Sequence, residues 1–234
     1  HWMVILNADN VGGVVETIPS GASSCAVAIS TSVSSSYGIG NSLFRTIMDG
    51  DPLEVDTVPF GCYKRSTLDK IGLYDTDLMR NQDDELNARL KQNKGRVYLI
   101  PEIKIKYYAR NSFGKLYSMF YQYGYFKPLV NRKLSHPSTL RQFVPLLFSM
   151  YLVFGLLVSI IFPSGFSYYI GGILFYFLTS LLMSLYYKKE PLVIINLIIA
   201  FFIIHFSYGV GYMKGILDFT ILKKNTSKNI EHSR

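Results

Sequence analysis

The sequence predicts an α/β domain over residues 1–142, followed by an α-helical transmembrane region over residues 143–213. Charge distribution is the first observation: residues 1–142 mix acids and bases as soluble domains do, whereas the apolar region carries only Lys188, Lys189 and Glu190. The second is the order of elements in the first part, where glycine turns, helix-period segments and short apolar strands alternate. The change in composition therefore predicts a domain boundary near residue 142.

The α/β domain is organised around residues 58–127. At their centre, residues 81–89 place three consecutive acids at the start of an expected helix, whose buried face is supplied by Leu86 and Leu90. A glycine turn and a short helix precede it. A strand over residues 96–100 follows, and we expect Pro101 to end it. Alternating side chains predict a second strand over residues 103–108.

The first 40 residues predict small local elements. Met3–Leu6 reads as a strand, Asn10–Gly13 as a turn and Val14–Val15 as a second strand. Residues 20–36 are rich in small side chains and predict a closely packed helix. Residues 38–40 predict a flexible loop or simply a turn that needs positive φ.

Two short segments contain the aspartates that a metal site would need. Asn7-Ala8-Asp9 lacks the first carboxylate of an Asp-x-Asp pair. Asp49-Gly50-Asp51 lies in a turn before proline, whereas carboxylates that hold Mg²⁺ or Mn²⁺ need a rigid strand end. Neither is assigned as a metal site. Cys25 and Cys62 lie far apart in sequence and indicate neither a zinc site nor a disulfide framework.

The net charge of +8 is concentrated in one stretch, because residues 104–142 hold eight Lys or Arg and no Asp or Glu. The stretch is rich in tyrosine and phenylalanine and adjoins an apolar segment. These features favour a lipid headgroup surface over nucleic acid. Within it, aromatic residues recur at helical spacing and predict an amphipathic interfacial helix at about 111–127.

Three apolar segments, 143–162, 166–187 and 191–213, each exceed the roughly 18 residues that a transmembrane helix needs. The basic residues before Phe143 and at Lys188–Lys189 predict cytoplasmic ends, with the turn at 163–165 outside. The basic polar tail, residues 214–234, would then lie outside. A basic tail on the outside conflicts with the tendency of basic residues to stay on the cytoplasmic side. An interfacial or re-entrant course for the third segment would remove this conflict.

Glycines in the third segment weaken the helix at residues 208–212. Gly209 and Gly211 would also let neighbouring helices approach closely. His205 in the same segment is either a functional group or a partner in a helix-to-helix hydrogen bond.

Several motifs occur in an order that resembles family 2 glycosyltransferases, in particular the membrane-bound branch typified by succinoglycan-biosynthesis glucosyltransferases. The resemblance covers about residues 7–127. It implies that residues 1–142 are the C-terminal, acceptor-binding part of a GT-A nucleotide-diphospho-sugar transferase domain. The motifs are Asn10-Val11-Gly12-Gly13, residues 37–42 with Phe44-Arg45, residues 55–58 with Phe60-Gly61, residues 81–89, and residues 122–124 with Lys127.

Sugar transfer with inversion needs a base for the acceptor hydroxyl and positive charge on the departing diphosphate. In the resembled family the base is an aspartate three residues before a leucine, which assigns Asp83. Gln82 stands where the pattern often has Glu, so Asp84 is a rival. A purely structural alternative also exists, because Asn81 can cap the helix and the acids complement its dipole.

The resemblance further implies an acceptor site near the glycine turn and on the aromatic helix. For each candidate position a non-functional interpretation is also open, in which the residue is ordinary surface or part of an interfacial helix without ligand contact. The candidate acceptor or substrate residues are Phe60, Gly61, Tyr63, Arg65, Gln122 and Lys127.

The implied reaction moves a sugar from a nucleoside diphosphate donor to a lipid-linked or polysaccharide acceptor in exopolysaccharide biosynthesis. It would take place on the cytoplasmic side of the plasma membrane. Mg²⁺ or Mn²⁺ is implied for the full-length enzyme. Because the chain starts at His1 and no strand ends in Asp-x-Asp, we expect a fragment without the donor half that does not turn over substrate.

A non-enzymatic membrane scaffold or transporter subunit with a soluble head is the alternative from another class. A transporter should pair polar residues among its spans, where only Asn196 and His205 stand out.

Overall fold

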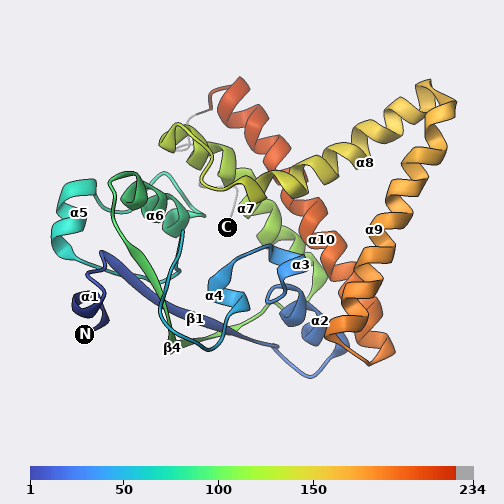
Figure 1. Ribbon diagram of the computed structural model, residues 1–234. Helices are drawn as coiled ribbons and strands as arrows, with labels where there is room; N and C mark the ends of the chain where they lie inside the picture. Colours follow the sequence, from blue (N-terminus) through green and yellow to red (C-terminus); the bar gives the residue numbers. More distant parts are fainter. Residues whose placement is uncertain (225–234) are drawn as a thin grey trace.

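The computed structural model describes residues 1–224, and its first part is built on a four-stranded sheet of order β2-β4-β1-β3 (Figure 1). The central strands β1 (Asn10–Ile18) and β4 (Val97–Tyr108) run parallel. The two-residue strands β2 (Leu53–Glu54) and β3 (Cys62–Tyr63) pair antiparallel at the two edges. The chain is therefore an α/β domain joined to a helical region.

The N-terminal segments differ from the prediction. Met3–Leu6 was expected to be a strand, but residues Trp2–Ile5 form helix α1, and its Trp2 and Met3 side chains pack against the sheet. Asn10–Gly13 was expected to be a turn and is the first half of β1, because it pairs with residues 97–100 of β4. Long-range pairing overrides the local preference of the two glycines for a turn.

Pro101 was expected to end the downstream strand and does not. The register of β1 against β4 shifts there, since Gly13 lies opposite Ile100 and Val14 opposite Lys104. Residues 101–103 bulge out of the ladder, so proline's missing N–H does not interrupt it. The two strands predicted at 96–100 and 103–108 are one strand with a bulge.

Helices surround the sheet. The small-residue segment forms α2 (Ser24–Ser32), and the expected loop after it contains two short helices, α3 (Ser36–Ile39) and α4 (Leu43–Thr46). Gly40 between them has φ 64°, as a turn glycine does. Helix α5 (Arg65–Ile71) ends at Gly72, with φ 87°, and the acidic helix is α6 (Gln82–Gln92). Leu86 and Leu90 are fully buried, as predicted.

The predicted interfacial helix is longer than expected, because α7 (Phe113–Leu134) continues past Lys127 and contains Pro128. A 3₁₀ turn, η1 (Leu140–Gln142), leads into α8 (Phe143–Ile161). A second turn, η2 (Pro163–Gly165), joins α8 to α9 (Phe166–Tyr187). Helix α10 (Pro191–Gly215) then continues as a π-helix, η3 (Ile216–Ile221). Three helical stretches, 140–161, 163–187 and 191–221, are long and apolar enough to cross a membrane.

The tip of the α8–α9 hairpin projects away from the sheet and the far end of α9 returns to α2, whereas α10 lies beside α7 (Figure 1). In the most apolar window of each stretch, 17% and 11% of the residues are buried for α8 and α9, but 39% for α10. One hydrophobic cluster joins Ile29 of α2, Leu116 of α7 and Ile204 of α10. The composition changes near residue 142, but the packing is continuous across that point.

Glycines bring α10 close to its neighbours. A methyl group at Gly124 would meet the carbonyl oxygen of Tyr208, and one at Gly211 would meet that of Tyr121. The expected close approach at Gly209 and Gly211 is confirmed. The expected weakening of the helix at residues 208–212 was wrong, because α10 is continuous there.

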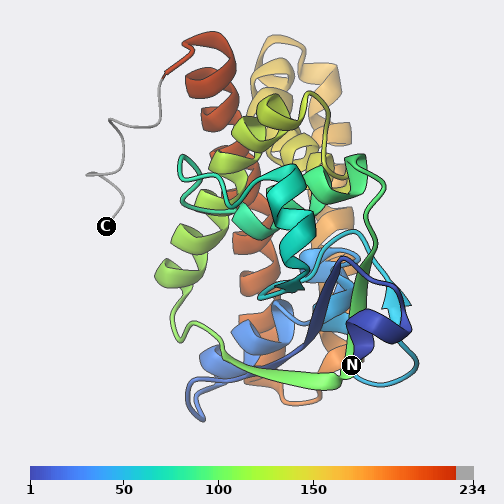
Figure 2. The same ribbon diagram turned by 90° about the vertical axis from the view of Figure 1, so that its left-hand side faces the viewer.

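Both halves of α10 and its π-helical extension are held by the first part of the chain (Figure 2). Near its start, Asn196 Nδ2 donates to Ser24 Oγ at 2.9 Å. Beyond its end, the Tyr125 hydroxyl donates to Asp218 at 3.0 Å. The basic tail was expected to start at residue 214, but residues 214–221 continue the helix, and residues 225–234 lie outside the described part.

Candidate active site

Helix α6 presents its first-turn acids in different directions, because successive helical residues are rotated by about 100°. Asn81 occupies the predicted N-cap position with φ 64°, and its side-chain amide donates to the Tyr123 carbonyl at 3.0 Å rather than capping the helix. Asp83, Asp84 and Glu85 follow in the first turn as predicted. Glu85 is buried and pairs with Arg89 at 2.8 Å, which is a structural role.

Asp83 is half-buried and is bound by neutral donors. The Tyr74 hydroxyl donates to its Oδ1 at 2.8 Å, and the backbone N–H of Phe60 donates to the same carboxylate. Burial nevertheless raises the pKa of Asp83 above its ordinary value, and the charge of Asp84 adds to the rise. Within residues 1–224, Asp83 has no ion-pair partner. Its carboxylate is therefore more basic than an exposed aspartate.

Two tyrosines stand beside Asp83. The rings of Tyr63 and Tyr74 meet edge to face with centroids 6.3 Å apart. Burial raises the pKa of both phenols, that of Tyr74 to about 12, so both hydroxyls are neutral donors at physiological pH. Phe60 has φ 52° and its side chain is 71% exposed, which leaves its N–H for Asp83 and its ring open to solvent.

A buried amide network, which the sequence reasoning missed, holds the Phe60 turn against α6. Asn10 Nδ2 donates to Asn87 Oδ1 at 2.6 Å, and Asn87 Nδ2 donates to Thr57 Oγ1 at 2.9 Å and the Val58 carbonyl at 3.0 Å. Both asparagines are fully buried. A polar residue directly after Leu86, on the buried side of the helix, is the signal that could have revealed it.

This network also explains why residue 61 is a glycine. A methyl group at Gly61 would collide with the side chain of Asn10, so the turn can lie over β1 only with glycine there. The Tyr63 hydroxyl donates to Asn87 at 3.1 Å and fixes the other end of the turn.

Asp84 faces the other side of α6. Its Oδ2 accepts from Lys127 Nζ of α7, and Lys127 is only 5% exposed. Asp84 also lines a cavity of about 340 Å³ between α6 and the segment after α7. The cavity is lined by Asp56, Thr57, Asp84, Ala88, Lys91, Gln92, His136, Ser138 and Thr139.

The remaining predicted site residues lie in different places. Gln122 on α7 accepts from Arg80 Nε at 2.8 Å, close to the start of α6. Arg65 pairs with Asp69 at 2.9 Å and its side chain is 85% exposed. The structure thus brings Phe60 and Tyr63 to Asp83 and Lys127 to Asp84, while Arg65 lies on the surface.

Metal ligands do not gather in the described part of the chain. Within residues 1–224, no group of three or more His, Cys, Asp or Glu could hold a metal ion. Asp9 accepts from the Thr67 hydroxyl and the Arg96 N–H, both at 2.9 Å, and Asp49 pairs with Lys104. These residues therefore do not fit a Mg²⁺ or Mn²⁺ site. Cys25 and Cys62 are free thiols.

Half of the basic stretch is neutralised by acids elsewhere in the chain, which leaves less charge for a lipid headgroup surface than the sequence suggests. The paired residues are Lys104, Lys127, Lys133 and Arg141.

His205 of α10 links three elements. One ring nitrogen lies 2.9 Å from the Tyr37 carbonyl of α3, and the other lies 2.9 Å from the Tyr176 hydroxyl of α9. The hydrogen-bonding alternative of the sequence analysis fits this geometry.

Comparison with known proteins identifies a glycosyltransferase relative. Over 167 residues, the chain is 30% identical to the dolichyl N-acetyl-alpha-D-glucosaminyl phosphate 3-beta-D-2,3-diacetamido-2,3-dideoxy-beta-D-glucuronosyltransferase of Methanococcus voltae. The match covers 69% of this chain and 47% of that protein, so the chain spans about half the length of the relative. No family model and no solved structure matches the chain.

Proposed function

We propose that the protein is a membrane-bound family 2 glycosyltransferase of GT-A fold. It would transfer a sugar, with inversion, from a nucleoside diphosphate donor to a lipid-linked acceptor. Asp83 carries the proposal, because it is a half-buried carboxylate with a raised pKa, held by Tyr74 and by the Phe60 turn. The relative's name describes a dolichyl-phosphate-linked sugar, which favours a lipid-linked acceptor over a growing polysaccharide.

In this proposal Asp83 is the general base. Its Oδ1 is held by Tyr74, and the carboxylate takes the proton of the acceptor hydroxyl as that oxygen attacks the anomeric carbon. The bond from the anomeric carbon to the diphosphate breaks at the same time, and the diphosphate leaves with the electron pair. Asp84 is the weaker candidate, because its charge is already compensated by Lys127.

The cavity beside Asp84 lies on the other side of α6 from Asp83, so it supports the alternative in which Asp84 is the base. Its volume of about 340 Å³ falls at the small end of the range of roughly 300–1,000 Å³ that is typical of ligand sites. Its lining combines acids, Lys91 and hydroxyls, which can bind sugar hydroxyl groups.

The donor side is proposed from the resemblance alone. Mg²⁺ or Mn²⁺ is proposed as the cofactor of the donor side, although the aspartates of residues 1–224 do not fit a site for it. Because no such site is found within residues 1–224, we expect the 234 residues alone not to turn over a nucleotide sugar. The role in exopolysaccharide biosynthesis is likewise a proposal.

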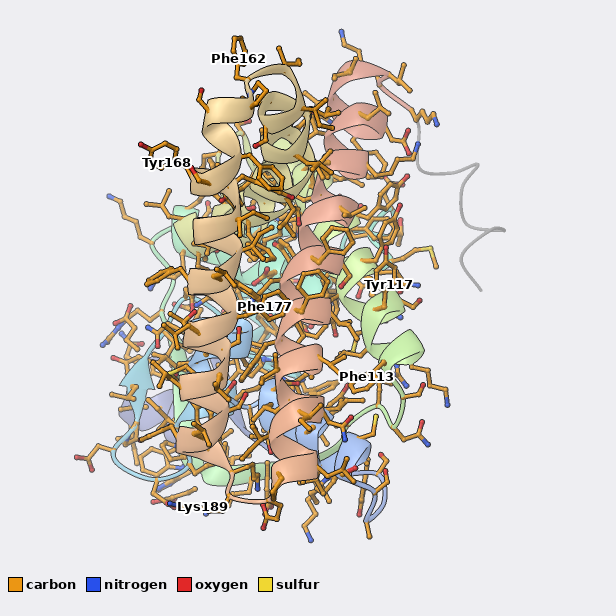
Figure 3. All side chains as sticks on the ribbon, turned by 90° about the vertical axis from the view of Figure 1, so that its right-hand side faces the viewer. Phe113, Tyr117, Phe162, Tyr168, Phe177 and Lys189 are labelled. Carbon is orange, nitrogen blue, oxygen red and sulfur yellow. The ribbon has the colours of Figure 1, made fainter. Side chains whose placement is uncertain are left out.

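The α8–α9 hairpin is the proposed membrane anchor, with the first domain on the cytoplasmic side of the plasma membrane. Phe162 at its tip is 62% exposed and Tyr168 on its outer face is 83% exposed (Figure 3). Such apolar surface is expected to contact lipid. Because α10 is held near both ends by Ser24 and Tyr125, we propose that it stays with the cytoplasmic domain.

A transporter subunit is less well supported. Asn196 donates to Ser24, and His205 binds the Tyr37 carbonyl, so these two polar side chains of α10 help to dock the helix on the first domain.

The proposal is tested with the complete natural protein in isolated membranes, by transfer of a radiolabelled sugar from nucleotide sugars to polyprenyl-linked acceptors. We expect D83N to reduce transfer by at least about 100-fold, since a general base contributes roughly 10²–10⁴. D69N is the matched control, because Asp69 is exposed and pairs only with Arg65 on α5. Full activity of D83N would exclude Asp83 as the base.

A further inference from the structure

The cavity of about 340 Å³ lies between α6 and the segment that joins α7 to α8. Asp84, Ala88 and Lys91 line it from one face of α6, because they are spaced by four and three residues. The other wall comes from residues 136–139, and residues 56–57 complete the lining. The cavity therefore adjoins both the helix that carries the candidate bases and the chain that leads into α8.

The walls of the cavity are tied to each other. Gln92 Nε2 of α6 donates to the Leu134 carbonyl at the end of α7, at 3.0 Å. Arg141 Nη2, just before α8, pairs with Asp56 Oδ2 at 3.0 Å. These contacts join parts of the chain itself, so the cavity is preformed, as most ligand sites are.

Hydrogen-bonding groups in the lining are only partly used. Lys127 binds Oδ2 of Asp84, and the pair of Arg141 and Asp56 likewise uses Oδ2. Within residues 1–224, no hydrogen bond reaches the Oδ1 atom of either carboxylate. In the same residues the buried Oγ of Ser138 has no hydrogen-bond partner, which is unusual for a buried polar atom. A ligand with hydroxyl groups would supply partners for both kinds of group.

The charges of the lining disfavour an anion. Two carboxylates line the cavity, and Lys91 already pairs with Glu54 at 3.0 Å. His136 uses its two ring nitrogens on Gln92 and on the Pro137 carbonyl. A phosphate in the cavity would be repelled by the carboxylates, whereas an uncharged polyol can donate hydrogen bonds to them.

An apolar surface begins beside the cavity. The chain of residues 136–139 continues into η1 and α8, where Leu140, Val144 and Leu147 are 79%, 67% and 63% exposed. Their spacing of four and three residues places them on one face. Exposed apolar surface of this kind marks a site of lipid contact. A ligand seated in the cavity can therefore carry a lipid that lies along the start of α8.

We propose that the cavity binds one uncharged sugar ring of the lipid-linked acceptor, with the lipid along the start of α8. A volume of about 340 Å³ is at the small end for ligand sites, which fits one ring and not an oligosaccharide. This inference rests on the proposed function, which supplies a sugar joined to a lipid. A ring in the cavity lies beside Asp84, the alternative base.

The test measures binding, so it does not depend on transfer activity. The 234-residue chain is purified in a detergent that has no sugar headgroup. Saturation-transfer NMR then measures its binding of the methyl glycosides of glucose, galactose, mannose and N-acetylglucosamine. We expect at least one of them to bind at millimolar concentration. A prenyl glycoside of the same sugar should bind more tightly, and inorganic phosphate should not compete.

S138A separates a ligand contact from a structural role. It removes a buried hydroxyl that has no partner within residues 1–224, so the variant should melt at the same or a higher temperature than the unchanged chain. Its affinity for the ring should nevertheless fall about 2- to 10-fold, the effect of one neutral hydrogen bond. S66A removes an exposed hydroxyl of α5 and should change neither quantity.

D56N tests a charged group of the lining. It should weaken ring binding about tenfold, because hydrogen bonds to charged groups are the stronger ones. R141Q breaks the same ion pair, but Arg141 does not line the cavity, so this variant should bind like the unchanged chain. Equal losses in D56N and R141Q would overturn Asp56 as a ligand contact.

Several outcomes would contradict the proposal. No binding of any methyl glycoside, or equal binding by S138A, D56N and the unchanged chain, overturns it. Competition by phosphate overturns the uncharged ligand, and equal affinity for prenyl and methyl glycosides overturns the lipid path. Loss of transfer in D83N together with a cavity that binds no glycoside would refute this inference alone. Ring binding that depends on Ser138, together with full transfer by D83N, would refute only Asp83 as the base.

Discussion

The Tyr74 hydroxyl donates a hydrogen bond of 2.8 Å to the carboxylate of Asp83, nine residues further along the chain. The two residues lie on the loop after α5 and in the first turn of α6, so the bond closes this loop over the helix start. It stabilises the charged carboxylate, whereas burial disfavours it. The balance between these two effects sets the basicity of the proposed catalytic group.

The first prediction concerns the stability cost of Asp83. Because its pKa in the folded state lies above the ordinary value of about 3.9, the folded protein favours the protonated form. The resulting stabilisation is present below that ordinary pKa and is lost as the pH rises through the folded value. At pH 7, D83N should therefore melt at the same or a higher temperature than the unchanged chain, while transfer falls. A clear drop in melting temperature would contradict this account.

The second prediction is the pH dependence of transfer. The acid limb of kcat/KM should lie above the ordinary carboxyl pKa, since Asp83 must be ionised to accept a proton. Y74F removes the hydrogen bond that stabilises the charged form, so the limb should move to higher pH. Y108F is the control, because Tyr108 is exposed at the end of β4. An unmoved limb in Y74F would show that another group controls it.

The third prediction tests the pair of Lys127 and Asp84. K127M leaves the Asp84 carboxylate partly buried without its cation, which should cost about 1–3 kcal/mol of unfolding free energy. Adding D84L should recover part of that loss, and a double-mutant cycle with thermal or denaturant unfolding measures the coupling. K115M on the same helix should change stability by less than about 0.5 kcal/mol. No coupling between the two positions would contradict the pairing.

The fourth prediction tests the packing of α7 on α10. G124A should destabilise the fold by about 1–3 kcal/mol, because its methyl group would meet the Tyr208 carbonyl. G114A lies in the first turn of α7, where an added methyl meets no described atom within 4 Å. It should leave stability unchanged or raise it by at most about 1 kcal/mol. Melting temperatures in one detergent allow the comparison, and equal losses would speak against close packing.

The fifth prediction is the topology. Single cysteines at Ser164, Lys189 and Lys224, in a chain with Cys25 and Cys62 replaced by serine, are labelled with a membrane-impermeant maleimide. Positions 189 and 224 should react only from the cytoplasmic side and position 164 only from outside, because both ends of α10 are held by the first domain. Labelling of position 224 from outside would mean that α10 crosses the bilayer.

The sequence alone determined those elements whose signals lie within a few neighbouring residues. Leu86 and Leu90 predicted the buried face of α6, residues 81–85 its acidic first turn, and residues 49–51 a turn. These predictions hold because helical spacing and the backbone preferences of glycine act over a few residues. Length and composition likewise predicted three apolar helices.

Only the tertiary structure decided which groups meet. The strand β1 formed where a turn was expected because β4 pairs with it, and Pro101 was accommodated by a bulge. The directions of Asp83 and Asp84 depend on what packs around α6, and Asn87 and Arg45 gained their partners from segments 28 to 77 residues away. Such contacts depend on register and helix rotation, which many distant side chains set together and which no short stretch of sequence encodes.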